Sequence, residues 1–408
     1  MVSSARADNV ADGDALSGIR VLDLATFIAA PFSATMMAEF GADVIKVEMP
    51  GRGDPCRQLG EKYNGVGLIW AQENRNKRGI TCDLRQEKGQ EIIRELVIRS
   101  DVLVENFRPG TMERWNMGYE VLKELNPGLV MVRVSAYGQT GPYREKAGFG
   151  RIAQAFGGLS YLAGYPDRPP VNPGSATIAD YAAGLFGSFS IMVALEHRRR
   201  TGEGQCIDIS LYESIFRLLD NLASAYDKLG FVRERQGTAT AHAVPHNHYP
   251  TRDGKWVAIA CTSDRIFQRL TKAMKRDDLG SDPRYTTSAG RVEHRDELDG
   301  VVSAWTQTYD MTDLIHLLDS EEVPVGAINS IADIFGDPQF AARGSMVEVD
   351  DPIVGKLKMP AIVPRMSSGL GRVKHLAPSL GQHNDDIYAG LLGFSPEKLA
   401  TLKGEGVV

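Results

Sequence analysis

The feature that most constrains the fold is an alternation of short β-branched runs with helical patterns in the first half of the chain. Between the runs, the segment 86–100 places Ile92, Ile93, Leu96 and Val97 on one helical face. Such strand–helix–strand units favour parallel pairing through right-handed crossovers. We therefore predict an α/β fold with a doubly wound, Rossmann-like sheet that binds ligands at the carboxyl ends of its strands. The expected strands cover residues 19–25, 42–48, 79–84, 101–107 and 128–138.

The second half of the chain predicts a separate, smaller domain. The tract 218–237 is polar and helical without a strand, which is typical of a linker. A new strand–helix pattern follows at 254–274, so we expect a smaller α/β domain at 238–330. A return segment begins within its last residues.

Composition excludes several classes of protein. The formal net charge of −6 argues against a dedicated nucleic-acid-binding protein. The four cysteines form no CxxC pair, which favours a reduced, cytoplasmic setting over a zinc ribbon or a redox pair. The N-terminus has no apolar signal region, and no apolar run reaches the length expected of a membrane span, about 18 residues.

The familiar motifs of nucleotide and metal sites are missing from the sequence. GxGxxG, Walker and GxSxG patterns are not found, and the residues after the first expected strand are "ATFIAAP". His246 and His248 in "PHNHYP" have no acid at ligand spacing, so loop or hydrogen-bonding roles are favoured and no metal site is expected.

Basic residues at the ends of expected strands are candidates for phosphate binding. Arg75, Lys77 and Arg78 precede one strand, whereas Arg108 and Arg114 follow another. The second pair opens a helix at a carboxyl end, where backbone N–H groups and the helix dipole favour phosphate. A solvated charged face explains the same spacing, and both interpretations stay open.

Asp180 is an acid among small and apolar residues in "PGSATIADYAAGLFG", near the start of an expected helix at 179–200. Aspartate is a preferred helix N-cap, and that role fits the bare pattern. The helix start would also lower the carboxylate pKa and keep the group ionised, as a nucleophile requires. Small neighbours would let a ligand approach the backbone, namely Ala179, Ala182, Ala183 and Gly184.

Longer segments add specificity that no single motif has. They are "GIRVLDLATFIAAPFSATMMAEFGADVIKVE", "NRNKRGITCDL", "SDVLVENFRPGTMERWNMG", "VSAYGQTGPY", "PGSATIADYAAG", "TGEGQCIDISLYES" and "LGQHNDDI". From about Gly18 to Val408 the chain thereby resembles the family III (CaiB/BaiF) CoA-transferases. The run "GQTGPYREKAGFGRIAQAFGGLSYLAG" is most similar to the branch of succinyl-CoA:L-malate (dicarboxylate) CoA-transferases.

The resemblance implies an architecture in which two chains interlock like links, as a homodimer or as a dimer with a sister subunit. It also implies that the chain leaves the large domain, forms the small one and returns. The expected division is a flexible leader at 1–17, a large domain of 18–217 plus 345–408, linkers at 218–237 and 331–344, and a small domain at 238–330.

The resemblance also implies roles for individual residues. Asp180 falls on the catalytic aspartate of the family, and Lys77 and Arg114 would meet the phosphates of CoA. Gly150 departs from the acid found at that position in many relatives, and Ile28 departs from the glutamine of formyl-CoA:oxalate transferases. The expected CoA-contacting residues are Ile28, Ala29, Ala30, Lys77, Asn106, Phe107, Arg114 and Tyr137.

The activity that the resemblance implies is transfer of CoA from an acyl-CoA, succinyl-CoA above all, to a dicarboxylic or hydroxy-dicarboxylic acid such as malate or citramalate. Asp180 would carry an anhydride and then a CoA thioester. Coenzyme A would be a substrate, with no bound cofactor. Arg151, with His246 or His248, would hold the distal carboxylate.

Two alternative functions share this resemblance. One is an acyl-CoA racemase, which the lack of a histidine in 149–154 argues against. The other is a subunit of a benzylsuccinate or itaconate CoA-transferase.

Overall fold

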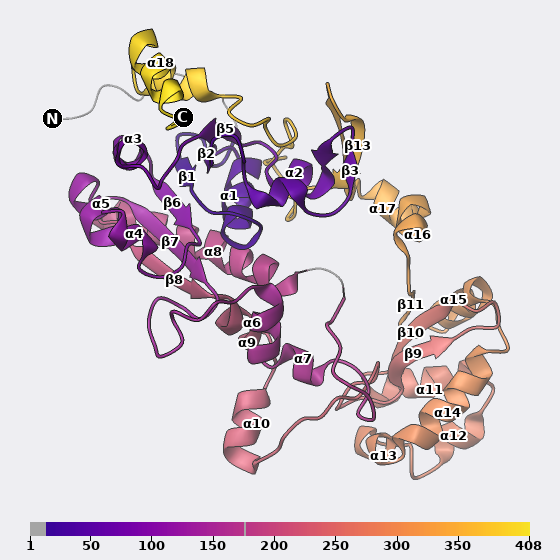
Figure 1. Ribbon diagram of the computed structural model, residues 1–408. Coiled ribbons are helices and arrows are strands. Elements are labelled where there is room, and N and C mark those ends of the chain that lie inside the picture. The colour runs from indigo at the N-terminus through magenta and orange to yellow at the C-terminus, as the bar shows by residue number, and fades with distance from the viewer. Residues whose placement is uncertain (1–13, 175–176) are drawn as a thin grey trace. The chain divides into compact units, whose positions relative to one another are not determined.

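A computed structural model describes residues 14–174 and 177–408 of the chain. It divides into two compact units, whose elements are labelled in Figure 1. The large unit contains residues up to 159, 174–221 and 342–408, and the smaller unit contains 160–173 and 222–341. Most of the leader expected at 1–17 lies outside the described residues.

The large unit is built on a six-stranded sheet in which every neighbouring pair is parallel. Counted along this sheet alone, the strands have the order 3-2-1-4-5-6, which is the Rossmann order. This confirms the predicted fold class. The strands, in spatial order, are β5 (Arg78–Thr81), β2 (Asp43–Glu48), β1 (Arg20–Asp23), β6 (Val102–Glu105), β7 (Val130–Ser135) and β8 (Cys206–Ser210).

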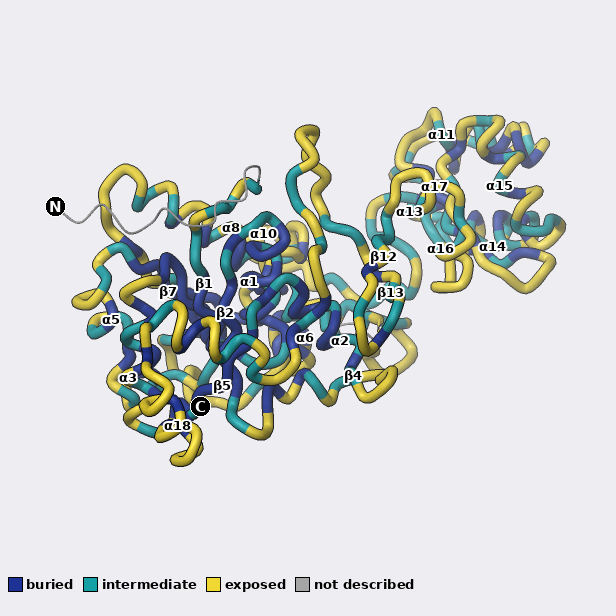
Figure 2. Tube along the Cα trace, turned by 90° about the horizontal axis from the view of Figure 1, so that it is seen from above, coloured by how far each residue is buried: buried dark blue, intermediate teal, exposed yellow. Residues whose placement is uncertain are grey.

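Both faces of this sheet are buried, which is why its strands are almost continuously apolar. Val21 and Val44 face α1 (Ala29–Glu39) and α8 (Ile178–Thr201), whereas their neighbours Leu22 and Ile45 face the opposite side. Figure 2 shows β1, β2 and β7 as buried tube at the centre of this unit. The opposite side is covered by α3 (Glu87–Val97), α5 (Tyr119–Leu125) and α18 (Pro396–Gly404).

The helices α1 and α8 pack closely because glycine and alanine line their contact. A Cβ atom on Gly184 would lie 2.8 Å from the Ala29 carbonyl oxygen and 2.8 Å from a Phe32 ring carbon. In the described part of the chain, α8 is the one helix long and apolar enough to span a membrane, by length and composition alone. Its small residues are buried, and Ala179 and Ala183 pack with residues of α1 in one apolar cluster.

The returning segment of the chain bonds to the edge of the sheet. His383 Nδ1 accepts the Gly79 N–H at 3.0 Å, and Asn384 Oδ1 accepts the Thr81 N–H at 2.9 Å. These bonds fill positions that an edge strand leaves open. The segment comprises the hairpin β12 (Met346–Asp351) and β13 (Gly355–Pro360), and the helical turn η2 (Asp386–Leu391).

The smaller unit holds an antiparallel sheet in the order β11 (Val325–Ala327), β10 (Trp256–Ala260) and β9 (His246–Pro250). Residues 160–173, which we expected in the large domain, group with this unit. The reason is a set of bonds to Tyr161, whose hydroxyl donates to Glu234 at 2.7 Å and whose carbonyl accepts from Arg235 at 2.9 Å. Its helices include α10 (Leu222–Leu229), α11 (Asp264–Ala273), α12 (Asp277–Ser281), α13 (Ser288–Glu293), α14 (Arg295–Thr306), α15 (Met311–Ser320) and α16 (Ile331–Gly336).

Short elements complete the described chain. Three of them are the helices α4 (Thr111–Arg114), α6 (Gly150–Phe156) and α9 (Leu211–Phe216). The others are η1 (Pro55–Gln58), β3 (Lys62–Tyr63), β4 (Val66–Gly67), α2 (Leu68–Glu73), α7 (Leu159–Leu162) and α17 (Pro338–Ala342).

Candidate active site

A pocket of about 440 Å³ opens within the large unit at the carboxyl ends of β1, β6 and β7. The strand order reverses between β1 and β6, and Rossmann-like sheets bind ligands at that point. The first residues of α6 and α8 complete the wall. The lining residues are Thr26, Phe27, Ile28, Ala29, Leu59, Asn106, Phe107, Arg108, Pro109, Val134, Ser135, Ala136, Arg144, Lys146, Ala147, Gly148, Phe149, Gly150, Arg151, Thr177, Asp180 and Leu211.

Asp180 contributes the one carboxylate among the described residues that line this pocket. It is the third residue of α8, and Thr177 holds the N-cap position. The helix N-cap role considered for Asp180 is therefore wrong. Its carboxylate accepts a hydrogen bond from the Thr177 hydroxyl and caps no backbone group among the described residues.

The expected lowering of the Asp180 pKa is also wrong. Burial raises the pKa of Asp180 above its ordinary value, and the hydrogen bond from Thr177 opposes that rise in part. Desolvation of the charged form is the larger of these two effects. A carboxylate with a raised pKa is a stronger nucleophile once it is ionised.

Gly150 packs its backbone closely against the Asp180 carboxylate. A Cβ atom at position 150 would lie 2.5 Å from Asp180 Oδ2 and 2.5 Å from Thr177 Oγ1, so a larger residue does not fit there unless something shifts. Gly150 and Asp180 line the same pocket. The small residues of α8 that we expected to give a ligand room are instead buried, namely Ala179, Ala182, Ala183 and Gly184.

The loop after β1 forms the inner wall of the pocket. Ile28 and Ala29 line it, whereas Ala30 is buried and is not part of the lining. Asn106 and Phe107, which follow β6, line the same wall.

Four basic residues line the outer part of the pocket, and all four are exposed. Arg144 is 3.4 Å from Glu145, and the Lys146 ammonium lies 3.5 Å from the centroid of the Tyr143 ring. No ion pair of Arg108 or Arg151 is found among the described residues. The pocket therefore presents four cations and one carboxylate, which favours an anionic ligand.

Sequence reasoning found Arg151 but named neither Arg144 nor Lys146, and it left Arg108 as an open candidate. The two missed residues lie in an exposed loop, where no periodic pattern marks a side chain for function. Their one signal was the run "GQTGPYREKAGFGRIAQ", which contains Arg144, Lys146 and Arg151 together.

Lys77 is not at the pocket, although we expected it to meet a phosphate. It is fully buried, and its ammonium donates to Asp23 Oδ2 at 2.9 Å, the Pro31 carbonyl at 2.9 Å and Asn74 Oδ1 at 3.0 Å. An ammonium has three protons, so none is left for a ligand. Burial lowers the pKa of Lys77, and Asp23 opposes this effect.

The remaining expected residues are not among the residues that line the pocket. Arg114 is exposed on α4 and donates to the Thr111 hydroxyl at 2.9 Å. Tyr137 packs edge-on against Phe156 with ring centroids 5.2 Å apart. His246 and His248 belong to β9 of the smaller unit. Among the described residues, no group of three or more His, Cys, Asp or Glu side chains is placed to hold a metal ion.

The fold and the pocket together define an α/β protein with a cationic pocket at its switch point, beside one carboxylate. Residues 16–384 match CoA-transferase family III, so the chain belongs to that family and is a CoA-transferase.

Relatives extend over almost the whole chain. The alpha subunit of succinyl-CoA:L-malate CoA-transferase from Chloroflexus aurantiacus is 45% identical, over 96% of this chain and 92% of its own. Succinyl-CoA:D-citramalate CoA-transferase from the same organism is 45% identical, over 96% of this chain and 98% of its own. A CaiB/BaiF family protein from Brucella suis has a similar structure, with a TM-score of 0.82 and 35% identity over 92% of this chain and 99% of its own.

Proposed function

We propose that this CoA-transferase moves CoA from succinyl-CoA to a dicarboxylic or hydroxy-dicarboxylic acid, with Asp180 as its covalent catalyst. The observation that carries the proposal is the Asp180 carboxylate, which is the one carboxylate among the described residues that line a cationic pocket and lies close to the backbone of Gly150. The substrate class is supported by the malate and citramalate transferases, which are 45% identical to this chain.

The proposed reaction needs no proton transfer. The Asp180 carboxylate attacks the thioester carbonyl, CoA leaves as a thiolate, and an aspartyl anhydride forms. The thiolate then attacks the Asp180 acyl carbon, which releases succinate and leaves a CoA thioester on Asp180. The acceptor carboxylate reverses these two steps and departs as its CoA ester. A pocket with one carboxylate and several cations suits this sequence of anionic steps.

The four basic residues divide between two anionic groups in this proposal. Arg151 directly follows Gly150, so its guanidinium is a candidate for the distal carboxylate of the diacid. Arg108, Arg144 and Lys146 are candidates for the phosphates of CoA, in place of Lys77, which has no free proton. His246 and His248 stay predicted contributors from the smaller unit.

A second chain is part of the proposed working unit. Four apolar side chains of α8 are exposed at positions 185, 189, 192 and 193, a spacing that puts them on one helical face. The Chloroflexus malate transferase has separately named alpha and beta subunits. We therefore propose a homodimer, or a dimer with a sister subunit.

We propose that the protein resides in the cytoplasm, since all four cysteines are free.

A panel of acids tests the function. Purified protein is incubated with succinyl-CoA and malate, citramalate, itaconate, benzylsuccinate or acetate in deuterated water, and CoA esters are identified by mass spectrometry. We expect new esters of hydroxy-dicarboxylates without deuterium at the α-carbon. Deuterium incorporation without a new ester would indicate a racemase, and transfer to acetate alone would refute the substrate class.

A further inference from the structure

The turn between β1 and α1 has a strained backbone at the pocket wall. Phe27 has φ = +62°, a left-handed conformation that is uncommon for an aromatic residue. Phe27 and its neighbours Thr26, Ile28 and Ala29 all line the pocket that contains Asp180. A relaxation of Phe27 to negative φ would therefore reshape this wall, so something must hold the turn in place.

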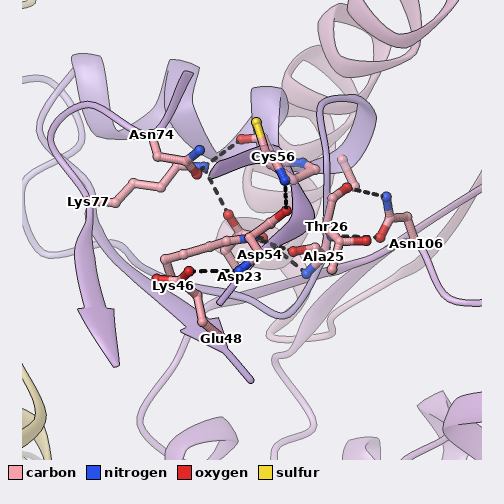
Figure 3. A network of polar contacts seen from close by, with 12 residues as sticks. Asp23, Ala25, Thr26, Lys46, Glu48, Asp54, Cys56, Asn74, Lys77 and Asn106 are labelled. Atoms are coloured by element: carbon pink, nitrogen blue, oxygen red, sulfur yellow. Dashed lines mark hydrogen bonds and ion pairs between the residues drawn. The ribbon is translucent and has the colours of Figure 1, made fainter. Parts of the chain in front are cut away.

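Asn106 forms hydrogen bonds with both backbone groups of Thr26, the residue before Phe27. Its Oδ1 accepts the Thr26 N–H at 2.8 Å, and its Nδ2 donates to the Thr26 carbonyl at 2.7 Å, as the dashed lines in Figure 3 show. The amide of Asn106 thus uses its acceptor and its donor on the two peptide units that flank the Cα atom of Thr26.

Asp54 holds Phe27 itself. Asp54 is 2% exposed, and its Oδ1 accepts the Phe27 N–H at 3.1 Å and the Cys56 N–H at 2.8 Å. Its Oδ2 pairs with the Lys46 ammonium at 2.9 Å, and Lys46 also donates to the Ala25 carbonyl. Figure 3 shows Lys46 and Asp54 together under the turn. The side chains of Lys46, Asn106 and Asp54 therefore bond the backbone of three successive residues, Ala25 to Phe27.

We infer that Asn106 is a positioning residue that keeps Phe27 in its left-handed conformation and so keeps the pocket wall in shape beside Asp180. The inference rests on the proposed function of this pocket, and it changes the expected role of Asn106. The resemblance implied contact with CoA, whereas here its side-chain amide is bonded to the protein's own backbone. Asp54 is the matching anchor on the other side of the strained residue.

The test compares Asn106→Ala in two backgrounds that differ by one Cβ atom. Glycine adopts positive φ without cost, so Phe27→Gly needs no clamp, whereas Phe27→Ala keeps the strain and loses the same ring. We expect Asn106→Ala to lower kcat/KM about tenfold in the Phe27→Ala background, which corresponds to about 1.4 kcal/mol of strain. In the Phe27→Gly background the expected loss is below about threefold, because the turn keeps its shape.

Equal losses in the two backgrounds, or no loss in either, would overturn the inference. A purely structural role would lower Tm by similar amounts in both backgrounds and leave the activity of the folded protein unchanged. If Asn106→Ala does not fold, Asn106→Asp replaces it, since it keeps the shape and loses the donor to Thr26. Asp180→Asn is assayed in parallel. Full activity of Asp180→Asn would refute the proposed chemistry. The comparison of Asn106→Ala in the two Phe27 backgrounds would still show whether Asn106 holds the turn.

Discussion

The inner wall and the outer rim of the pocket are built in opposite ways. The inner wall, residues 25–29, is held by Asn106, Asp54 and Lys46. Each of these side chains forms a hydrogen bond with the backbone of the wall. The rim, residues 144–151, carries exposed cations with few partners among the described residues. A wall beside reacting atoms must keep its shape, and side chains bonded to its backbone provide this. Exposed cations at the rim suit the binding of a negatively charged ligand.

The largest effect on kcat is expected from a substitution of Gly150, the rim residue that lies against the Asp180 carboxylate. Gly150→Ala puts a Cβ atom 2.5 Å from Asp180 Oδ2 unless something shifts. Because a displacement of about 1 Å at a reacting group costs about 100-fold, we expect kcat to fall by about that factor. Steady-state kinetics with succinyl-CoA and the best acceptor of the panel measure the change.

Gly300→Ala in α14 is the matched control, because a Cβ atom there would meet nothing within 4 Å. It should leave kcat unchanged and keep Tm at or above the wild-type value, since alanine favours helix. Wild-type kcat in Gly150→Ala would show that the position of the Asp180 carboxylate beside residue 150 does not matter for catalysis.

A smaller effect is expected from a single rim charge. A hydrogen bond to a charged group contributes about 1.5–3 kcal/mol, so Arg151→Ala should lower kcat/KM for a dicarboxylic acceptor by about 10- to 100-fold. For a monocarboxylic acceptor we expect little change. Arg99→Ala, an exposed arginine outside the pocket lining, is the control. Equal losses for both kinds of acceptor would contradict the role of Arg151.

The smallest effect is on stability and depends on pH. Burial raises the pKa of Asp180, so the folded state binds this proton more tightly than the unfolded state does. The ionised group therefore destabilises the fold above its folded pKa, and this cost disappears below its unfolded pKa. We expect Asp180→Asn to raise Tm slightly at pH 7, and the difference to shrink at pH 3.

Differential scanning calorimetry at the two pH values checks this sign, and a lower Tm for Asp180→Asn at pH 7 would contradict it. The same raised pKa predicts that wild-type kcat/KM decreases as the pH falls through it, because the nucleophile must be ionised.

The sheet was predictable from the sequence because strands buried on both faces are marked by continuous apolar runs. The burial of Lys77 was not predictable from the sequence. Its partner Asp23 is 54 positions away, and a lysine that precedes a strand is usually exposed to solvent. The alanines and glycine of α8 fit both a ligand site and a helix contact, and the structure shows the contact with α1. Asp180 itself was picked out by the resemblance, since its local pattern favoured a cap.

The covalent role of Asp180 is tested most directly by trapping. Protein incubated with succinyl-CoA is treated with hydroxylamine, which converts an aspartyl anhydride or thioester to a hydroxamate, and is then digested and analysed by mass spectrometry. We predict a hydroxamate on the peptide that contains Asp180, formed only when succinyl-CoA is present. A hydroxamate on another peptide, or none from a protein that is transferring CoA, would contradict the account.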